Sequence, residues 1–497
     1  MKTKTLFLSM ALINSLQASA QKKIYTEKYR PQFHFSPAKN WCNDPNGLVY
    51  NNGTYHLFYQ HNPFGNQWGH MTWAHATSKD LIHWKHMPIA IPEENGIMIF
   101  SGTCVVDKDN TSGFGKDGKI PMVAVYTGHI ENKNQSQNIA YSLDDGITWK
   151  KYAKNPVLDL QKVDFRDPKI FWYEPKKYWV MNVMLPVEHV VQFYSSTNLK
   201  QWKYLSDFGP AGDTSGVWEC PDLTAVPIEG MPDKKKWVLQ MSMNASMQYF
   251  VGEFDGEKFI NENPTDKILR PDYGPDYYAA IVYNQLPASH LPTSIGWVNN
   301  WNYANDIPTT PWKSAMAIPR NLSVKKINSE WLVIQKPVSI TNSLQKEIFK
   351  SAEIIVIDKN ILPVKSKQFE LQVHMEPAAN AVCGLKIAVG DNNYFEIGYN
   401  AATKIFYIDR SKSGNIIFND NFKKLLRFEK NIALKDNKIH LQIFYDNSIA
   451  EIFVNGGEAV FTAQLFPNKG DNRIELFNIG LKSKFEKLQI WEMKSVW

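Results

Sequence analysis

A short pattern recurs along the first two thirds of the chain and restricts its fold more than any other feature. The pattern is a serine, a turn-forming Asp or Asn two residues later, and an aromatic residue a few positions further on. It occupies residues 78–84, 142–149 and 196–202, and a weaker copy without the serine lies at 254–259. The three serines are 64 and 54 residues apart. A period of about 50 to 65 residues, built from short strands and turns, is typical of β-propeller blades.

The segments between these copies have the character of strands and not of helices. Residues 122–126 and 237–241 are short, rich in β-forming residues and bounded by turn residues. Residues from about 27 to 335 leave room for five blades of this period. We therefore predict an all-β chain whose residues 21–335 form a five-bladed β-propeller.

A second all-β unit is predicted for residues 336–497. Lys336-Pro337 marks the joint, and the runs 369–373, 438–444 and 450–454 alternate apolar and polar residues. Asn455-Gly456-Gly457 supplies a hairpin turn. Such period-2 patterns at short spacing predict an antiparallel β-sandwich. It has no obvious catalytic cluster, so we expect it to pack against the propeller, with polysaccharide binding as a second role open to it.

The first 20 residues have the pattern of a secretory signal peptide. Lys2 and Lys4 precede an apolar run at 6–16, and Ala18-Ser19-Ala20 is a small-residue cleavage site. The run is too short to span a membrane, and no later segment reaches 18 apolar residues. We expect cleavage after Ala20 and an exported protein, periplasmic or extracellular, without a membrane anchor.

The net charge and the cysteine content argue against nucleic acid as a partner, a disulfide framework and a zinc site. The net charge is +6, or +4 without Lys2 and Lys4, and no basic cluster suggests nucleic acid. Four cysteines are too few for a disulfide framework, and no CxxC pair suggests zinc. Buried free thiols are expected, with one bridge between Cys42 and Cys220 left open. The 16 Trp and 22 Tyr suit either sugar platforms or a β core.

Three acidic residues lie in unusual surroundings within the predicted propeller. Asp44 lies in Asn-Asp-Pro-Asn-Gly, Asp167 in Phe-Arg-Asp-Pro, and Glu219 in Trp-Glu-Cys-Pro. A lone Asp-Pro-Asn-Gly is usually a surface turn. However, the intervals of 123 and 52 residues are about two and one blade periods. Equivalent positions of different blades meet around the propeller axis, so we expect the three acids to converge on one axial pocket.

Converging carboxylates are what glycoside hydrolysis requires. One acts as nucleophile or base, and another stays protonated to donate to the leaving oxygen. Like charges held close together raise one pKa and so supply that acid. Arg166 is expected to keep its neighbour Asp167 ionised, which leaves Asp44 and Glu219 as the reacting pair.

The chain resembles glycoside hydrolase family 32, the invertase, inulinase and levanase group, over nearly its whole mature length. The exo-levanase and fructan β-fructosidase branch is the most similar, by residues 30–37 and 68–73. The motifs that carry the resemblance occur in family order, at residues 30–37, 41–47, 58–63, 100–102, 165–168, 218–221, 276–279 and 318–320.

The resemblance implies a five-bladed propeller plus β-sandwich and a retaining hydrolase that releases fructose from levan, inulin or sucrose, without metal or cofactor. Asp44 would attack C2 of the terminal fructosyl unit, Glu219 would serve as acid and then base, and Asp167 would hold ring hydroxyls. The implied substrate-binding residues are Asn43, Gln60, Trp68, Ser101, Arg166, Tyr278 and Trp297. Trp301, Trp73 and Phe100 are alternatives for the roles given to Trp297 and Tyr278.

Two positions depart from the family pattern: Cys42 stands where methionine is usual, and His61 where tyrosine is frequent. We expect His61 to be a hydrogen-bonded supporting residue and not a catalytic one. A sialidase-type propeller is an alternative because residues 142–149 resemble an Asp-box, but the three acidic motifs hold a single arginine, Arg166. The other alternative functions are endo-acting hydrolysis, fructosyl transfer and non-catalytic fructan binding. Linkage preference, β-2,6 or β-2,1, and oligomeric state stay open.

Overall fold

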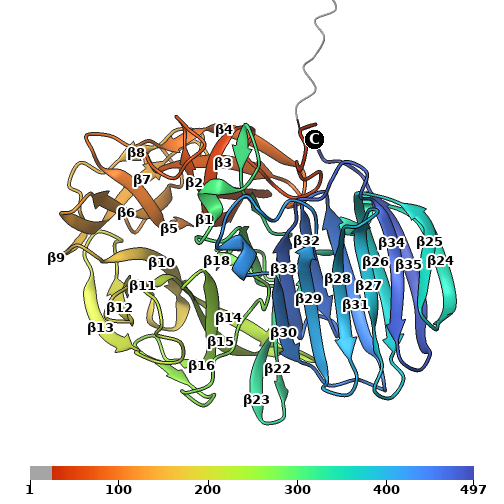
Figure 1. Cartoon of the computed structure of the whole chain (residues 1–497). Helices are drawn as coiled ribbons and strands as arrows, with labels where there is room; N and C mark the ends of the chain where they lie inside the picture. Colours follow the sequence, from red (N-terminus) through yellow and green to blue (C-terminus); the bar gives the residue numbers. More distant parts are fainter. Residues whose placement is uncertain (1–24) are drawn as a thin grey trace, which may run out of the picture.

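The computed structural model describes residues 25–497, and its regular secondary structure is almost entirely β-strand (Figure 1). The predicted signal peptide at residues 1–20 lies outside the described residues. Four short 3₁₀ segments accompany the strands in the described part: η1 (Glu174–Lys176), η2 (Ala304–Asp306), η3 (Ser339–Leu344) and η4 (Phe422–Lys424). No helix within residues 25–497 is long and apolar enough to cross a membrane.

Five antiparallel units, each with four main strands, make up the N-terminal part, and the fourth and fifth are joined edge to edge into one sheet. The first unit contains β1 (Asn40–Asn51), β2 (Thr54–Asn62), β3 (Thr72–Ser78) and β4 (Trp84–Ile91). The second contains β5 (Met98–Val106), β6 (Met122–Ile130), β7 (Asn134–Ser142) and β8 (Lys150–Lys151), with β9 (Leu158–Lys162) also paired to β7. The third contains β10 (Arg166–Tyr173), β11 (Tyr178–Leu185), β12 (Val190–Ser196) and β13 (Lys203–Phe208).

The fourth unit contains β14 (Trp218–Ile228), β15 (Met231–Met243), β16 (Ser246–Phe254) and β17 (Phe259–Asn261). The fifth contains β18 (Tyr278–Val282), β19 (Thr293–Val298), β22 (Arg320–Ile327) and β23 (Glu330–Pro337). Two short strands complete these sheets: β20 (Trp312–Lys313) pairs with β1, and β21 (Ala315–Met316) pairs with β19.

The first strands of the five units contact one another in a closed ring. β1 contacts β5, β5 contacts β10, β10 contacts β14, β14 contacts β18, and β18 contacts β1. Figure 1 shows this ring on the left, with the first strands toward its middle. This arrangement is a five-bladed β-propeller, as the spacing of the repeat predicted.

The repeated sequence pattern marks the same turn in four of the blades. Residues 78–84, 142–149, 196–202 and 254–259 each join the third strand of a blade to the fourth. In the first copy, Ser78 Oγ accepts from the backbone N–H of Leu81 (2.9 Å), and Asp80 Oδ1 accepts from that of His83 (2.8 Å). Asn198 makes the equivalent bonds with residues 200 and 201. The local hydrogen bonds therefore explain why the pattern recurs once in each of these four blades.

The C-terminal part is a sandwich of two six-stranded antiparallel sheets, on the right of Figure 1. One sheet contains, in spatial order, β24 (Gln345–Val356), β35 (Ser483–Met493), β26 (Gln368–Glu376), β31 (Ile439–Asp446), β32 (Ile449–Val454) and β33 (Ala459–Gln464). The other contains β25 (Lys359–Lys365), β34 (Arg473–Ile479), β27 (Val382–Val389), β28 (Tyr394–Asn400), β29 (Ile405–Lys412) and β30 (Arg427–Asn431).

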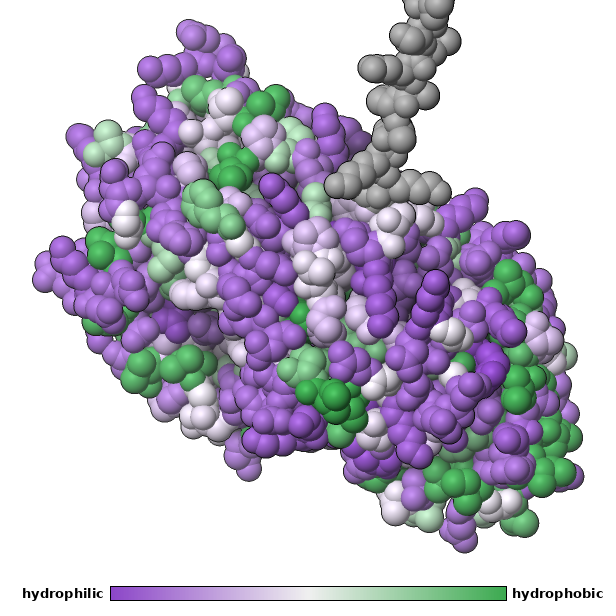
Figure 2. All heavy atoms as spheres, turned by 45° about the horizontal axis from the view of Figure 1, so that its top comes forward, coloured by the Kyte–Doolittle hydropathy of each residue, from purple (hydrophilic) through white to green (hydrophobic). Residues whose placement is uncertain are grey.

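Apolar side chains from both sheets fill the space between them and form one buried core. On the outside, the face shown in Figure 2 is mainly hydrophilic, with hydrophobic residues in small separate groups. The chain passes from propeller to sandwich through η3, which follows the end of β23 at Pro337. The division into domains at residues 21–335 and 336–497 stays a prediction.

Buried ion pairs join the sandwich to the propeller. Arg320 of β22 contacts Glu451 of β32 at 2.5 Å, and the ring of His34 lies between Glu451 (3.0 Å) and Asp446 (2.9 Å). The side chains of these four residues are fully buried. Their charges are therefore paired with opposite charges, as burial requires.

Candidate active site

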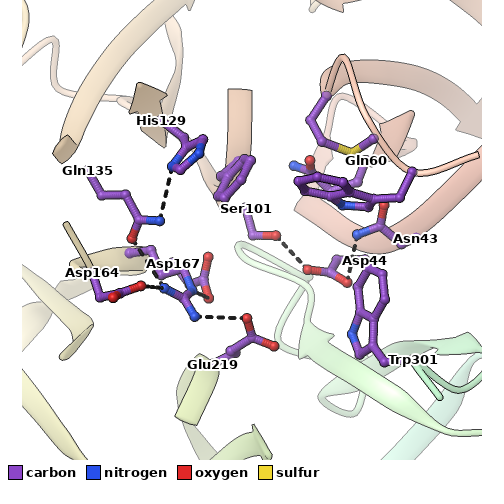
Figure 3. Close-up of a pocket in the computed structure, with 14 residues that line it drawn as sticks. Asn43, Asp44, Gln60, Ser101, His129, Gln135, Asp164, Asp167, Glu219 and Trp301 are labelled. Atoms are coloured by element: carbon purple, nitrogen blue, oxygen red, sulfur yellow. Dashed lines mark hydrogen bonds and ion pairs between the residues drawn. The ribbon is translucent and has the colours of Figure 1, made fainter. Parts of the chain in front are cut away.

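A pocket of about 370 Å³ opens at the axis of the propeller (Figure 3). Its walls include the three acids that the sequence singled out: Asp44 on β1, Asp167 on β10 and Glu219 on β14. The other lining residues are Asn43, Gln60, Trp68, Met71, Phe100, Ser101, His129, Gln135, Asp164, Arg166 and Trp301.

An irregularity in each innermost strand aims these side chains into the pocket. The strand register shifts between Cys42 and Pro45, Ile99 and Gly102, Arg166 and Lys169, Glu219 and Asp222, and Tyr278 and Ile281. A β-bulge of this kind bends a strand and redirects a side chain. Asp167 also has a left-handed backbone, with φ of +64°. The Asp-Pro sequences suit these sites because proline has no N–H to lose from the ladder.

Asp44 is nearly buried and is held by three donors. Ser101 Oγ donates to Asp44 Oδ2 at 2.7 Å, and Asn43 Nδ2 donates to Oδ1 at 3.1 Å. The thiol of Cys220 lies 3.5 Å from Oδ2. Burial raises the pKa of Asp44, and the nearby charge of Glu219 raises it further, while these three donors oppose the rise.

Glu219 is more open, and two side chains fix its carboxylate. Arg166 Nη2 donates to Glu219 Oε1 at 3.1 Å, and the hydroxyl of Tyr278 donates to Oε2. The side chain of Glu219 is 25% exposed. Arg166 and Tyr278 therefore orient the carboxyl group of Glu219, which remains accessible to a ligand in the pocket.

Asp167 is buried and receives a hydrogen bond from the backbone N–H of Cys220, at 2.9 Å. Burial raises the pKa of Asp167 to about 7, and the charge of Arg166 only partly offsets this. The expectation that Arg166 keeps Asp167 ionised is therefore met only in part, because Arg166 lowers the pKa of Asp167 but does not outweigh burial. The guanidinium of Arg166 lies nearer to Asp164 (2.7 Å) and Glu219 (3.1 Å) than to Asp167 (3.9 Å).

Most of the predicted substrate-binding residues reach the pocket wall: Asn43, Gln60, Trp68, Ser101 and Arg166. Gln60 Nε2 is buried and has no hydrogen-bond partner among the described residues. The same holds for Nε1 of Trp301, a residue named above only as an alternative. Unsatisfied buried donors are costly, so both N–H groups are suited to bind hydroxyl groups of a ligand.

The other two predicted binding residues lie behind the wall. Tyr278 is 2% exposed and acts through its bond to Glu219. Trp297 is fully buried, and its indole N–H donates to the carbonyl oxygen of Cys42 at 3.1 Å. Trp297 packs against Trp301, so Trp301 and not Trp297 presents an indole to the pocket.

The two positions that depart from the family pattern are supporting residues in the fold. His61 Nδ1 donates to the carbonyl oxygen of Trp41 at 2.7 Å and does not line the pocket. The Cys42 thiol lies 3.4 Å from the carbonyl oxygen of Lys313. All four cysteines are buried free thiols, so the bridge left open between Cys42 and Cys220 is not formed.

Four lining residues escaped the sequence reasoning: Met71, His129, Gln135 and Asp164. Met71 lies in the stretch 68–73 that carries part of the resemblance but was given no role, and the other three lie in no motif with recognisable chemistry. Asp164 had one available signal, since it stands two residues before Arg166 and forms an ion pair with it. His129 and Gln135 reach the pocket only because β6 and β7 pair in the folded chain.

Carboxylates that meet in one pocket are what carboxylate-dependent glycoside hydrolysis requires. Residues 34–337 match the N-terminal domain model of glycosyl hydrolases family 32, and residues 335–492 match the C-terminal model of the same family. The chain therefore belongs to glycosyl hydrolases family 32 and is a glycoside hydrolase. This family assignment excludes the sialidase-type alternative.

Known relatives resemble the chain over almost its whole length. A levanase of Bacillus subtilis (strain 168) is 44% identical, with 99% of this chain and 74% of that protein covered. An extracellular exo-inulinase of Aspergillus niger is 37% identical, with 99% of both chains covered. The crystal structure of an exo-inulinase from Aspergillus awamori superposes with a TM-score of 0.89 at 36% identity, covering 95% of this chain and all of that one.

Proposed function

We propose that this protein hydrolyses β-fructans from their ends and releases fructose, with sucrose as a further substrate. The observation that carries the proposal is the meeting of Asp44 and Glu219 in one axial pocket, each held by donors of its own. The relatives named as levanase and exo-inulinase support fructans as the substrate class. The relatives and the solved structure named as exo-inulinases support exo action over endo action.

In the first step, Asp44 attacks C2 of the terminal fructosyl unit. The bond from C2 to the bridging oxygen breaks, and Glu219 gives its proton to that oxygen. The products are the shortened chain and a fructosyl ester of Asp44. The donors from Ser101 and Asn43 favour the ionised form of Asp44 that this attack needs.

In the second step, Glu219 acts as a base. It takes a proton from a water molecule, whose oxygen attacks C2 and displaces the carboxylate of Asp44. Two displacements at C2 retain its configuration. Asp167 and Arg166 hold ring hydroxyls. In its ionised form, Asp167 also stabilises the positive charge that develops on the sugar ring.

Product analysis on levan, inulin and sucrose in parallel tests the proposed function. We expect free fructose as the first product from each substrate, with no intermediate oligosaccharides. Early appearance of mixed oligosaccharides would show endo action. Larger products built from sucrose would show fructosyl transfer, because a sugar and water compete for the same ester intermediate.

We also propose that the protein is exported. The sequence pattern at residues 1–20 supports this, as does the extracellular exo-inulinase among its relatives. Detection of the protein with Gln21 as its N-terminus outside the cytoplasm would support the proposal, and an intact Met1 terminus would contradict it.

A further inference from the structure

A buried ion pair lies behind the pocket wall, and the proposed mechanism gives it no role. The pair joins Lys169 of β10 to Asp222 of β14, with Nζ 2.9 Å from Oδ2. Only 6% of the Lys169 side chain and none of the Asp222 side chain is exposed. Lys169 lines a void of about 10 Å³ together with the pocket residue Asp167. Opposite charges in the interior therefore join two of the strands that carry pocket acids.

Each member of the pair stands where a bulged strand resumes its regular pairing. β10 is irregular between Arg166 and Lys169, and β14 is irregular between Glu219 and Asp222. Arg166 and Glu219 are the last regularly paired residues before these bulges, and both line the pocket. Lys169 and Asp222 are the first paired residues after them. The ion pair thus connects the two bulges on the side away from the pocket.

The same pair also binds β18, the strand that carries Tyr278. Lys169 Nζ donates to the carbonyl oxygen of Val282 at 2.5 Å, and Asp222 Oδ2 accepts from the backbone N–H of Val282 at 2.8 Å. β18 has its own irregularity between Tyr278 and Ile281, directly before Val282. Strands of three neighbouring blades are therefore fastened to one another just beyond their bulges.

The contacts of Asp222 keep this junction rigid. Its second oxygen, Oδ1, accepts from Thr224 Oγ1 at 2.6 Å, while Oδ2 faces Lys169 and Val282. Hydrogen bonds between charged groups are stronger than neutral ones. Sliding β10 along β14 would separate two opposite charges in the interior, where an unpaired charge is costly. The pair therefore opposes movement of one strand relative to the other.

We infer that Lys169 and Asp222 are positioning residues for the proposed acid, Glu219. The inference rests on the proposed function. Glu219 is held directly by Arg166, from the bulge of β10, and by Tyr278, from the bulge of β18. Both supports come from the strands that the ion pair fastens to β14. Without the pair, Glu219 shifts from the position in which it gives its proton, while the nucleophile on β1 keeps its own donors.

Two substrates that differ in their need for an acid test this inference. Sucrose requires a proton on its leaving oxygen, whereas β-fructofuranosyl fluoride releases fluoride without one. The value of kcat/KM reports the steps up to the departure of the leaving group, so it isolates the step in which Glu219 is the acid.

The decisive variant is the double variant Lys169→Met, Asp222→Asn, because it removes both charges at nearly constant shape and leaves neither unpaired. We expect its Tm to stay near that of the wild type. Its kcat/KM for sucrose should fall by roughly tenfold to a hundredfold, and that for the fluoride by less than about threefold.

A milder variant keeps the inference testable if the double variant does not fold. Thr224→Val has the same shape but lacks the hydroxyl that holds Asp222 Oδ1. It should lower the ratio of the sucrose to the fluoride kcat/KM by about twofold to fivefold, the effect of one hydrogen bond. In that case this ratio alone decides.

A control variant separates positioning from a general loss of stability. Leu385 of β27 is fully buried in the sandwich core, so Leu385→Ala should lower Tm and leave the ratio of the two kcat/KM values unchanged. Equal losses on sucrose and fluoride in the folded double variant, or a wild-type ratio there, would overturn the inference. A wild-type protein inactive on both substrates would instead refute the proposed function.

Discussion

At the residue scale, the three carboxylates of the pocket differ in what surrounds them. Asp44 has three side-chain donors, Glu219 has an arginine and a tyrosine, and Asp167 has a backbone N–H and a distant guanidinium. These surroundings raise the pKa of Asp44 and of Asp167 through burial and leave the carboxyl group of Glu219 partly open to the pocket. They are the physical basis for giving the three acids different roles.

Replacing the proposed acid should have effects that depend on the leaving group. Glu219→Gln cannot supply a proton, so we expect kcat/KM for sucrose to fall by about a thousandfold or more, and that for β-fructofuranosyl fluoride far less. Azide, which needs no base to attack the ester intermediate, should restore turnover of the fluoride. Steady-state kinetics on both substrates measure this, and equal losses would contradict the acid assignment.

The burial of Asp167 predicts a gain in stability when its charge is removed. Its pKa rises from 3.8 to about 7 on folding, so its ionisation costs native stability as pH rises from about 4 through 7. Asp167→Asn should stabilise the protein at pH 8 by up to roughly 4 kcal/mol, with no gain at pH 3.5. The measurement is the difference in Tm between variant and wild type across this pH range. A constant difference would contradict the raised pKa.

At the element scale, the bulges in the five innermost strands connect the fold to the site. They interrupt the hydrogen bonding between strands at the place where carboxylates from separate blades must point into the axial pocket. Gly47, just after the first bulge, has φ of +55°, and a Cβ there would lie 2.7 Å from the ring of Phe58. The path of β1 past Asp44 therefore depends on a glycine.

Gly47→Ala should consequently cost both stability and activity. We expect the clash and the left-handed backbone together to cost roughly 3 kcal/mol, and to displace Asp44 enough to lower kcat at least tenfold. Gly96→Ala is the matched control, because Gly96 has φ of +74° and open space around its Cβ position. It should lose only about 1 kcal/mol and keep full activity. Thermal unfolding and sucrose kinetics of the two variants distinguish these effects.

The repeat and the spacing of the acids were sufficient to predict the propeller, because the Asx residue makes local hydrogen bonds in every copy and the serine does so in the three copies that contain one. The choice between Trp297 and Trp301 was not predictable, since both lie near the same bulged strands and only the packed fold shows which is covered. The raised pKa of Asp167 could not be predicted from the sequence either. A sequence shows that Arg166 is adjacent, but not that its guanidinium turns to Asp164 and Glu219.

At the scale of the whole molecule, buried charges hold the sandwich against the propeller. The ring of His34 bridges Asp446 and Glu451, and these carboxylates raise its pKa to about 9 despite burial. Arg320, which also contacts Glu451, adds a positive charge to the cluster. Association of the two parts is therefore coupled to the protonation of one histidine.

This coupling predicts a loss of stability in alkaline solution. A histidine with a raised pKa stabilises the fold fully below pH 6.5, and the contribution disappears as pH rises through about 9. We expect about 3 kcal/mol to be lost between these limits, and His34→Gln to remove this part of the pH dependence. Calorimetry at pH 6 and pH 9.5 measures it. A variant that keeps the wild-type pH dependence would contradict the proposed role of His34.

The proposed mechanism depends above all on a covalent bond between Asp44 and the fructosyl unit. The most direct measurement uses Glu219→Gln with β-fructofuranosyl fluoride, because the ester forms without an acid and breaks down slowly without a base. Mass spectrometry of the intact protein and its peptides should show one fructosyl unit, attached to the peptide that contains Asp44. The same treatment of the double variant Asp44→Asn, Glu219→Gln should show none. Fluoride release without any adduct, or an adduct on a peptide that lacks Asp44, would contradict this mechanism.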